Sequence, residues 1–140
     1  MASIESIEGI GPAQGKKLRA AGIRSCEALL KRGAGKKGRK AIADECGVPE
    51  KSVLEWVNRS DLMRIKGVGS EYSDLLEAAG VDTVKELRNR NAANLTEKMA
   101  EVNDAAIKKT KRSIVRRTPS NSEVERWVAH AKTLDPMVTH

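Results

Sequence analysis

The chain has 140 residues, of which 39% are hydrophobic, 32% are charged and 2% are aromatic, and its formal net charge is +7. This length allows one domain or two small halves. The low aromatic content argues against single-strand binding by base stacking, whereas the positive charge suggests an anionic partner such as nucleic acid, a basic surface without a partner being the alternative.

The first half of the chain predicts a series of short helices. Apolar residues recur in it at spacings of three and four, the period of a helix with one buried face. Gly22 should end one of these helices in the left-handed conformation, and Gly47 should end another. Three glycines make residues 33–40 a loop that runs into the next helix. The expected helices are residues 3–7, 13–21, 26–32, 39–46 and 49–58.

The second half continues in the same way. Thr83 and Glu86 form a capping-box pattern, as do Ser122 and Glu125, and each pair should open a helix. Asn94 is expected to cap a further helix. The expected helices are residues 70–79, 83–90, 94–102, 105–117 and 122–134, the last of which has a regular apolar stripe.

One glycine-containing stretch occurs twice, at residues 7–18 and again at 65–76. Each copy reads apolar, any residue, Gly, apolar, Gly, and then a helix. Aligning residues 7–34 with 65–92 needs no gap and gives ten identities in twenty-eight positions. We therefore predict an all-α protein in which the two copies pack into one compact pseudo-twofold body. The expected divisions are residues 1–58 for the first repeat, 59–118 for the second, and 119–140 for a C-terminal amphipathic helix and tail.

The repeated stretch has the features of a phosphate site. Two glycines around one apolar residue let a partner approach the main chain, and the helix start that follows leaves N–H groups unpaired and carries partial positive charge. The alternative is that the glycines only allow a tight crossing of helices. The candidate residues are Gly9, Ile10, Gly11, Lys16 and Lys17 in the first copy and Lys66, Gly67, Val68 and Gly69 in the second.

A basic segment and an acidic difference complete the predicted interface. Residues 31–40 carry six positive charges and no acid, and such a run either lies along a nucleic-acid backbone or is simply solvated. The second copy carries Glu71 and Asp74 after its glycines, and because these acids repel phosphate, we expect that copy to bind DNA more weakly or to serve a protein partner. The phosphate candidates in the basic segment are Lys36, Lys37 and Arg39.

No pattern indicates catalysis, metal binding or membrane contact. Nothing places a nucleophile beside a base, and the sequence has no phosphate-loop motif. His130 and His140 have no second ligand at metal spacing, and Cys26 and Cys46 are expected to be buried thiols. Without a signal-peptide pattern or a long apolar run, the sequence predicts a cytoplasmic, non-enzymatic protein.

These residues resemble the helix-hairpin-helix family. The resemblance implies an all-helical protein that binds DNA without sequence preference, with its hairpin amides at the phosphate backbone, and it allows a monovalent cation at a hairpin. The matching positions are Ile7, Gly9, Ile10, Gly11, Lys16, Lys17 and Leu18 in the first copy and Ile65, Gly67, Val68, Gly69 and Leu76 in the second.

A longer pattern is similar to a bacterial group catalogued only as a domain of unknown function (four-three-three-two in that series). This resemblance covers nearly the whole chain and implies a fold, not a function. Its segments include Trp56-Val57-Asn58, Arg64-Ile65-Lys66-Gly67-Val68-Gly69 and Ala78-Ala79-Gly80-Val81-Asp82-Thr83-Val84.

The sequence therefore predicts a protein that binds duplex DNA at its phosphates, mostly across the minor groove, and that is associated with the nucleoid. The alternative is a protein-interaction adaptor that uses the helical fold as a scaffold, with the acidic second copy and Trp56 as its contact surface. Trp56 and Trp127 are otherwise expected in the core. The choice between DNA and structured RNA and the oligomeric state stay open at this point.

Overall fold

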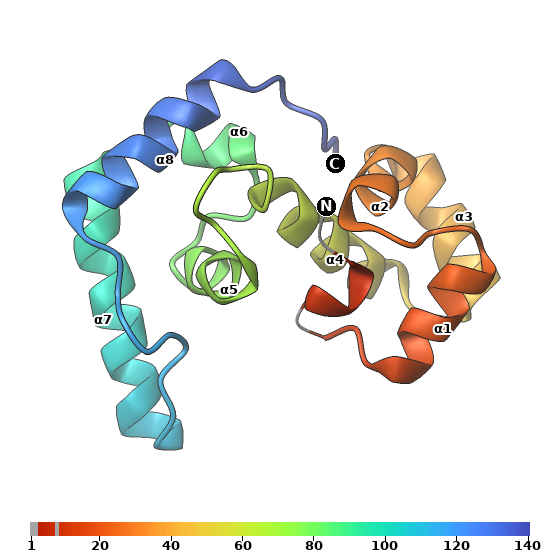
Figure 1. Ribbon diagram of the computed structural model, residues 1–140, viewed down its shortest axis with the longest axis horizontal. Coiled ribbons are helices and arrows are strands. Elements are labelled where there is room, and N and C mark those ends of the chain that lie inside the picture. Colours follow the sequence, from red (N-terminus) through yellow and green to blue (C-terminus); the bar gives the residue numbers. More distant parts are fainter. Residues whose placement is uncertain (1–2, 8) are drawn as a thin grey trace. The chain divides into compact units, whose positions relative to one another are not determined.

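The computed structural model describes residues 3–7 and 9–140, and within these ranges its regular elements are helices (Figure 1). The all-α class is thereby confirmed. One isolated antiparallel bridge joins Ser3 to Ser25, and none of the described helices is both long and apolar enough to cross a membrane. The elements are the 3-10 helix η1 (Ile4–Ser6) and the helices α1 (Pro12–Ala20), α2 (Cys26–Gly33), α3 (Lys36–Cys46), α4 (Glu50–Leu62), α5 (Ser70–Ala78), α6 (Val84–Leu87), α7 (Ala92–Thr110) and α8 (Asn121–Thr133).

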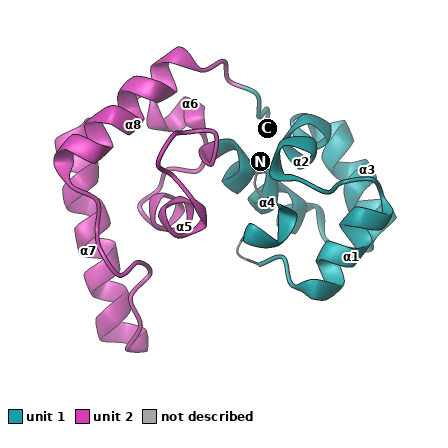
Figure 2. Ribbon diagram, in the orientation of Figure 1, with its two compact units in different colours: residues 1–61, 137–140 teal, residues 62–136 magenta. Residues whose placement is uncertain are grey.

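The chain divides into two compact units (Figure 2). Unit 1 contains residues 1–61 and 137–140, and unit 2 contains residues 62–136. The sequence set residues 119–140 apart, but α8 belongs to unit 2 because its buried Trp127 is part of the core of that unit. The packing of the two repeats into one pseudo-twofold body stays a prediction.

The core of unit 1 consists mainly of branched aliphatic side chains, since the chain has no phenylalanine. Helix α1 packs on η1 and on α3, and α3 packs on α2. The C-terminal residues also belong to this unit, where the Thr139 N–H donates to the Ala34 carbonyl at 2.8 Å. Side chains that are at most 2% exposed include Ile4, Ile7, Leu18, Ile23, Leu29, Ile42, Val53 and Val57.

Unit 2 has its own core, in which α8 packs on α6 and α7 and α5 packs on α7. The apolar stripe expected on the last helix faces this core, with Val124 and Val128 buried on either side of Trp127. Tyr72 of α5 packs against Trp127 with ring centroids 5.1 Å apart, a tilted aromatic pair of the kind that contributes about 0.5–1.5 kcal/mol.

The two copies of the repeated stretch have the same local backbone after their first helix. Gly22 and Gly80 follow α1 and α5 with φ of 86° and 92°. The residue after each glycine donates its N–H to a leucine carbonyl of the preceding helix, at 2.9 Å in unit 1 and 2.8 Å in unit 2. Ser25 and Thr83 then cap the next helix with their side-chain oxygens. The left-handed conformation predicted for Gly22 is confirmed. Gly47 ends α3 as expected, and it too is left-handed, with φ of 65°.

The structure corrects the helices that were expected over residues 94–102 and 105–117. Helix α7 runs without a break through the expected junction and ends at Thr110. Its cap is Asn91 rather than Asn94, because the Asn91 side chain accepts the Asn94 N–H at 3.0 Å.

The chain leaves the helix after Thr110 because a buried side chain binds the segment that follows. The amide oxygen of Asn103, a residue only 7% exposed, accepts the N–H of Ile114 at 2.8 Å and of Val115 at 3.1 Å. Lys111 takes the left-handed conformation, with φ of 65°. These hydrogen bonds of Asn103 therefore explain why the helix does not continue to Arg117, as the apolar spacing had predicted.

The capping box of the last helix lies two residues before its expected place. Ser120 and Glu123 form it instead of Ser122 and Glu125. The Ser120 hydroxyl accepts the Glu123 N–H at 3.2 Å, and the Glu123 carboxylate accepts the Ser120 N–H at 3.2 Å. Both pairs satisfy the same spacing rule, so spacing alone did not distinguish them.

Gly38 allows the first turn of α3 to lie directly against the end of α2. A Cβ built on Gly38 would overlap the carbonyl oxygen of Arg32. We expect Gly38→Ala to lower the free energy of unfolding by about 1–3 kcal/mol, because the backbone has to move apart. Gly35→Ser is the control, since nothing lies within 4 Å of its Cβ and serine is favoured at a helix N-cap. Urea unfolding that gave equal losses for both variants would contradict this packing.

Candidate nucleic-acid interface

Turn 1, defined here as residues 7–11, connects η1 to α1. The Ile10 N–H donates to the Ile7 carbonyl at 3.2 Å, and Gly9 has a φ of 94°, as a type II turn requires at its third residue. The prediction for Ile10 is therefore wrong, because its N–H is used inside the turn and its side chain is buried. The N–H groups of Gly9 and Gly11 have no acceptor in the described part of the chain.

Turn 2, residues 65–69, has the same geometry in unit 2. The Val68 N–H donates to the Ile65 carbonyl at 3.0 Å, and Gly67 has a φ of 92°. Val68 is also buried, so the prediction for Val68 is wrong for the same reason as in turn 1. Gly67 and Gly69 are exposed, and their N–H groups have no acceptor among the described residues.

An ion pair connects η1 to α1 across turn 1. Arg19 donates to both carboxylate oxygens of Glu5, at 2.7 and 2.8 Å, and such a two-point contact fixes orientation as well as charge. The guanidinium lowers the pKa of Glu5 to about 2. The negative charge of Glu5 is thus neutralised by Arg19.

The N-caps of α1 to α3 and of α5 to α8 fall into two classes. Side-chain oxygens cap α2, α6, α7 and α8, from Ser25, Thr83, Asn91 and Ser120 respectively. Helices α1, α3 and α5 instead have glycine at the N-cap position and no side-chain cap, so their first N–H groups stay available to an external acceptor. The first turns of α1 and α3 also contain no acid, whereas that of α5 contains Glu71. The partial positive charge of α1 and α3 is therefore not offset locally.

The four lysines that were predicted in unit 1 are exposed. Lys36 and Lys37 occupy the first two positions of α3, directly at its uncapped start. Lys16 and Lys17 follow in the second turn of α1, about 6 Å along the axis from its first residue. None of the four forms an ion pair with another described residue, so their charges remain available.

Arg39 lies inside unit 1, and the prediction that it contacts phosphate is wrong. It is only 5% exposed, and its guanidinium donates to the carbonyls of Gly33 and Ala34 at 2.9 Å each and to that of Thr139 at 2.6 Å. Burial lowers the pKa of the guanidinium, a cost that these three hydrogen bonds offset. Arg39 therefore satisfies carbonyls at the end of α2 and fixes the C-terminal residues.

The basic side chains of residues 31–40 therefore form two groups, those already engaged by other residues and those that are exposed without an ion-pair partner among the described residues. Lys31 pairs with Glu27 at 3.5 Å, Arg32 pairs with Glu45 at 3.7 Å, and Arg39 is internal as described above. The cations of this segment that are exposed and have no ion-pair partner among the described residues are Lys36, Lys37 and Lys40.

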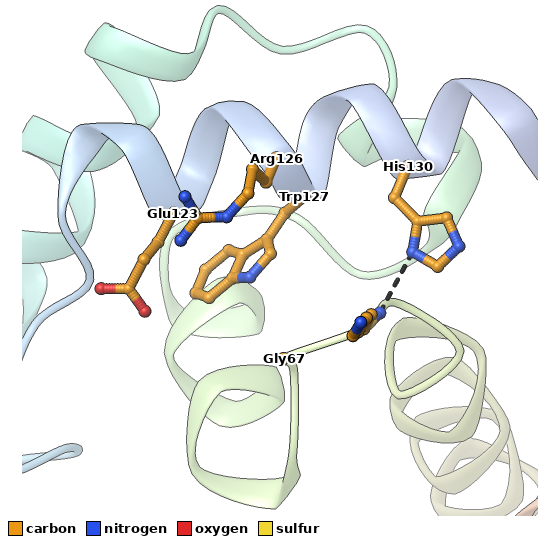
Figure 3. Close-up of a pocket in the computed structure, with 6 residues that line it drawn as sticks. Gly67, Glu123, Arg126, Trp127 and His130 are labelled. Atoms are coloured by element: carbon orange, nitrogen blue, oxygen red, sulfur yellow. Dashed lines mark hydrogen bonds between the residues drawn. The ribbon is translucent and has the colours of Figure 1, made fainter.

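In unit 2, turn 2 and α8 line a pocket of about 410 Å³ (Figure 3). His130 connects the two elements, because its Nδ1 accepts the Lys66 N–H at 3.1 Å. Lys66 and Arg126 are exposed and form no ion pair with a described residue. The lining residues are Lys66, Gly67, Glu123, Arg126, Trp127 and His130.

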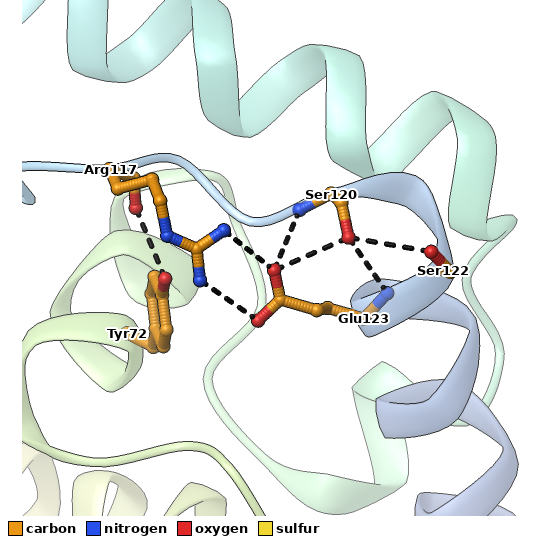
Figure 4. A network of polar contacts seen from close by, with 5 residues as sticks. All are labelled: Tyr72, Arg117, Ser120, Ser122 and Glu123. Carbon is orange, nitrogen blue, oxygen red and sulfur yellow. Dashed lines mark hydrogen bonds and ion pairs between the residues drawn. The ribbon is translucent and has the colours of Figure 1, made fainter.

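Glu123, an acid at this pocket, is already engaged by neighbouring groups (Figure 4). Arg117 donates to its two carboxylate oxygens at 3.0 and 3.4 Å, and the Ser120 N–H donates to one of them at 3.2 Å. The Arg117 guanidinium, followed by the Ser120 N–H, holds the pKa of Glu123 below its usual value. Because Arg117 neutralises Glu123, the net charge of the pocket is positive, and it comes from Lys66 and Arg126.

Residues 8–134 match the family described as "Domain of unknown function (DUF4332)". The chain belongs to this family. The matched range contains all of the helices α1 to α8. No curated protein matches the chain, and no solved structure matches it.

This DUF4332 chain has a second repeated element, which was not predicted above from the sequence. It is a helix with Val, Trp and Val at positions i, i+3 and i+4, in α4 and again in α8. In each unit the tryptophan lies beside the first glycine of the turn, with its Nε1 3.4 Å from a Cβ built on Gly9 and 3.2 Å from one built on Gly67. The residues are Val53, Trp56 and Val57 in unit 1 and Val124, Trp127 and Val128 in unit 2.

The Val-Trp-Val pattern can be seen in the sequence, but its two copies are not separated by the same number of residues as the two glycine turns. The glycine turns are 58 residues apart, whereas the tryptophan helices are 71 residues apart. A gapless alignment that matches the turns therefore misaligns the helices. The additional residues of the second copy coincide with the long α7, which has 19 residues where α3 has 11.

Among the residues that the structure describes, no group of three or more His, Cys, Asp or Glu side chains could hold a metal ion. Cys26 and Cys46 are free and buried, as expected, and burial raises the pKa of both thiols, which is typical of unreactive cysteines. The monovalent cation at a turn stays a prediction.

The ion pair across turn 1 predicts an acid-dependent loss of stability. Because folding lowers the pKa of Glu5 from 4.5 to about 2, the contribution of the pair is fully present above pH 4.5 and is lost as the pH falls towards 2. We expect the melting temperature of the wild type to fall more steeply across this window than that of Glu5→Gln, which cannot titrate. Parallel melting curves against pH, or an NMR titration of the Glu5 carboxyl near its ordinary value, would contradict this.

Proposed function

We propose that this protein binds duplex DNA without sequence preference, and that turn 1 with α1 and turn 2 with α5 are the hairpins of two helix-hairpin-helix motifs. The observation that carries the proposal is the distribution of helix caps. Four helices are capped by a side chain, whereas α1, α3 and α5 begin with glycine and no cap. A phosphate oxygen is an acceptor that suits such a helix start, and the net charge of +7 favours an anionic partner.

Unit 1 contributes the stronger part of this proposed interface. The N–H groups of Gly9 and Gly11 would donate to phosphate oxygens, and the exposed Lys36 and Lys37 would add charge beside the uncapped start of α3. All of these groups recognise the sugar–phosphate backbone and not the edges of bases. The proposed binding is therefore independent of base sequence.

Unit 2 would contribute a second, differently charged contact. Glu71 lies in the first turn of α5, which weakens the attraction for phosphate there. Lys66 of turn 2 and Arg126 of α8 are exposed and have no ion-pair partner among the described residues, and they offset this acid. We therefore propose contacts through the N–H groups of Gly67 and Gly69 together with these two cations.

The adaptor alternative loses its main support. Trp56 was its expected exposed contact, but this side chain is only 5% exposed and packs beside Gly9. No other observation on the described residues favours a protein partner over nucleic acid, so we do not pursue it as a second function.

The first test of the proposal is the salt dependence of duplex binding. If four to six phosphates are neutralised, the logarithm of the affinity should fall with the logarithm of the salt concentration with a slope of about −4 to −5. The double variant Lys36→Glu, Lys37→Glu should weaken binding at low salt by at least about tenfold and make the slope less steep by about 2. Gel shifts or fluorescence anisotropy with unrelated duplexes measure both quantities.

A matched double variant controls for net charge alone. Lys98→Glu with Lys109→Glu makes the same change in charge on exposed positions of α7 in unit 2. This control should retain most of the affinity. Equal losses in both double variants, or a wild-type complex insensitive to salt, would overturn the proposed contact at α3.

A second test adds a cap to the start of α3. Gly35→Asp should stabilise the protein by up to about 1 kcal/mol, because aspartate is a preferred N-cap and nothing within 4 Å blocks its Cβ. The same carboxylate would occupy the N–H groups that phosphate needs, so duplex affinity should fall by about fivefold or more. Ala93→Asp is the control, since it adds an acid in the first turn of α7, which Asn91 already caps. Unchanged DNA binding by the stabilised Gly35→Asp protein would remove α3 from the interface.

A further inference from the structure

The pocket lined by turn 2 and α8 has the charge and size of a site for a small anion. Lys66 and Arg126 contribute two positive charges without an ion-pair partner among the described residues, while Glu123 is neutralised by Arg117. The volume of about 410 Å³ lies in the range of small-ligand sites, about 300–1,000 Å³. The pocket can thus hold a phosphate group together with part of the molecule that carries it.

A donor on a largely buried side chain opens onto the same pocket. The Trp127 side chain is only 3% exposed and lines the pocket, and its indole N–H has no hydrogen-bond acceptor among the described residues. The nitrogen itself is not among the fully buried unpaired atoms of the described residues, so a ligand in the pocket can reach it. Its Nε1 lies 3.2 Å from a Cβ built on Gly67, and Figure 3 shows the indole directed from α8 towards turn 2. The main-chain N–H of Gly67 also has no acceptor among the described residues. These two donors are therefore open to an acceptor that a ligand brings.

His130 fixes turn 2 relative to α8. Its Nδ1 accepts the Lys66 N–H at 3.1 Å, so this nitrogen carries no proton and the neutral ring has its proton on Nε2. The bond holds the backbone at Lys66, while the Val68 N–H is held by the turn itself. We regard His130 as a positioning residue for the Gly67 N–H.

The corresponding positions of unit 1 carry the opposite charge. Helix α4 has Glu55 immediately before its tryptophan, where α8 has Arg126, and the sequence of turn 1 has Glu8, which lies outside the described residues, where turn 2 has Lys66. The cationic pocket is therefore a feature of unit 2 and not of the repeated unit in general. Such a difference is expected if one copy has acquired a ligand that the other does not bind.

We propose that turn 2 and α8 form a binding site for a phosphate monoester. A monoester carries a charge of about −1.5 to −2 at neutral pH, which matches two unpaired cations better than the single charge of a backbone diester. Its oxygens would accept the N–H groups of Gly67 and Trp127, with Lys66 and Arg126 as counter-charges. The carrier is either a small phosphorylated molecule or the terminal phosphate of a nucleic-acid strand. The site does not depend on duplex binding through unit 1. In unit 2 a bound monoester would replace the duplex phosphate proposed above for the Gly67 N–H, Lys66 and Arg126.

The two tryptophan indole N–H signals in a ¹⁵N NMR spectrum of the full chain provide the test. Ribose 5-phosphate, a single strand with a 5′-phosphate and the same strand with a 5′-hydroxyl are titrated separately, with ribose as a blank. We expect a saturable shift of the Trp127 indole and Gly67 amide signals, with the Trp56 indole unchanged. A shift with ribose 5-phosphate identifies a small-molecule site, and a shift only with the phosphorylated strand identifies a strand end. No saturable shift with either phosphate, or equal movement of the Trp56 signal, overturns the proposal.

A matched pair of variants in α8 distinguishes binding of the monoester in this pocket from general electrostatic attraction to the basic protein. Arg126→Gln should weaken monoester binding by about tenfold or more, whereas Lys132→Gln removes the same charge from an exposed position of α8 outside the pocket and should bind like the wild type. Both proteins should show the wild-type helical circular dichroism. Equal weakening in the two variants would overturn the proposal, even if the double variant in α3 still lost its affinity for duplex DNA.

Discussion

The left-handed glycine at the third position of each turn is the constraint on which the two units depend. At Gly9 and Gly67 the positive φ allows the turn to close its own hydrogen bond, and only glycine takes this conformation at little cost. The missing side chain also leaves room for the indole of Trp56 in unit 1 and of Trp127 in unit 2. Turn, helix start and tryptophan helix are therefore positioned together, and a side chain at either glycine would disturb all three.

Three helix starts in this chain are left without a side-chain cap, although a cap would stabilise them. A side-chain cap is worth about 1 kcal/mol to a helix, and four helices have one. Helices α1, α3 and α5 lack such a cap, although serine or aspartate could stand at the extended N-cap positions Gly35 and Gly69 without a neighbour within 4 Å. Stability alone does not explain these open helix starts, and this is the reason why we propose an anionic partner for them.

The positions of lysine and arginine in the sequence do not show which positive charges are exposed and unpaired in the described structure. Arg39 lies in the most basic segment but serves the interior, while its neighbours Lys36 and Lys37 are exposed and unpaired in the described structure. The second copy, which looked less suitable because of its acids, has Lys66 and Arg126 at a pocket whose own acid is neutralised. The distribution of ion pairs, and not the count of lysine and arginine, decides where an anion can bind.

The sequence by itself determined the all-α class, most of the helices, the left-handed glycines and the repeat of the turn, because periodicity and backbone preference are local properties. The turns use the N–H groups of Ile10 and Val68 in hydrogen bonds that span three residues, so turn chemistry could have predicted them. Only the tertiary structure decided which of the other donors remain open. Arg39 donates to the carbonyl of Thr139, one hundred residues away. The end of α7 was decided by Asn103, whose partners lie 11 and 12 residues further along the chain. Such hydrogen bonds depend on which residues meet in space, and no spacing rule along the chain predicts them.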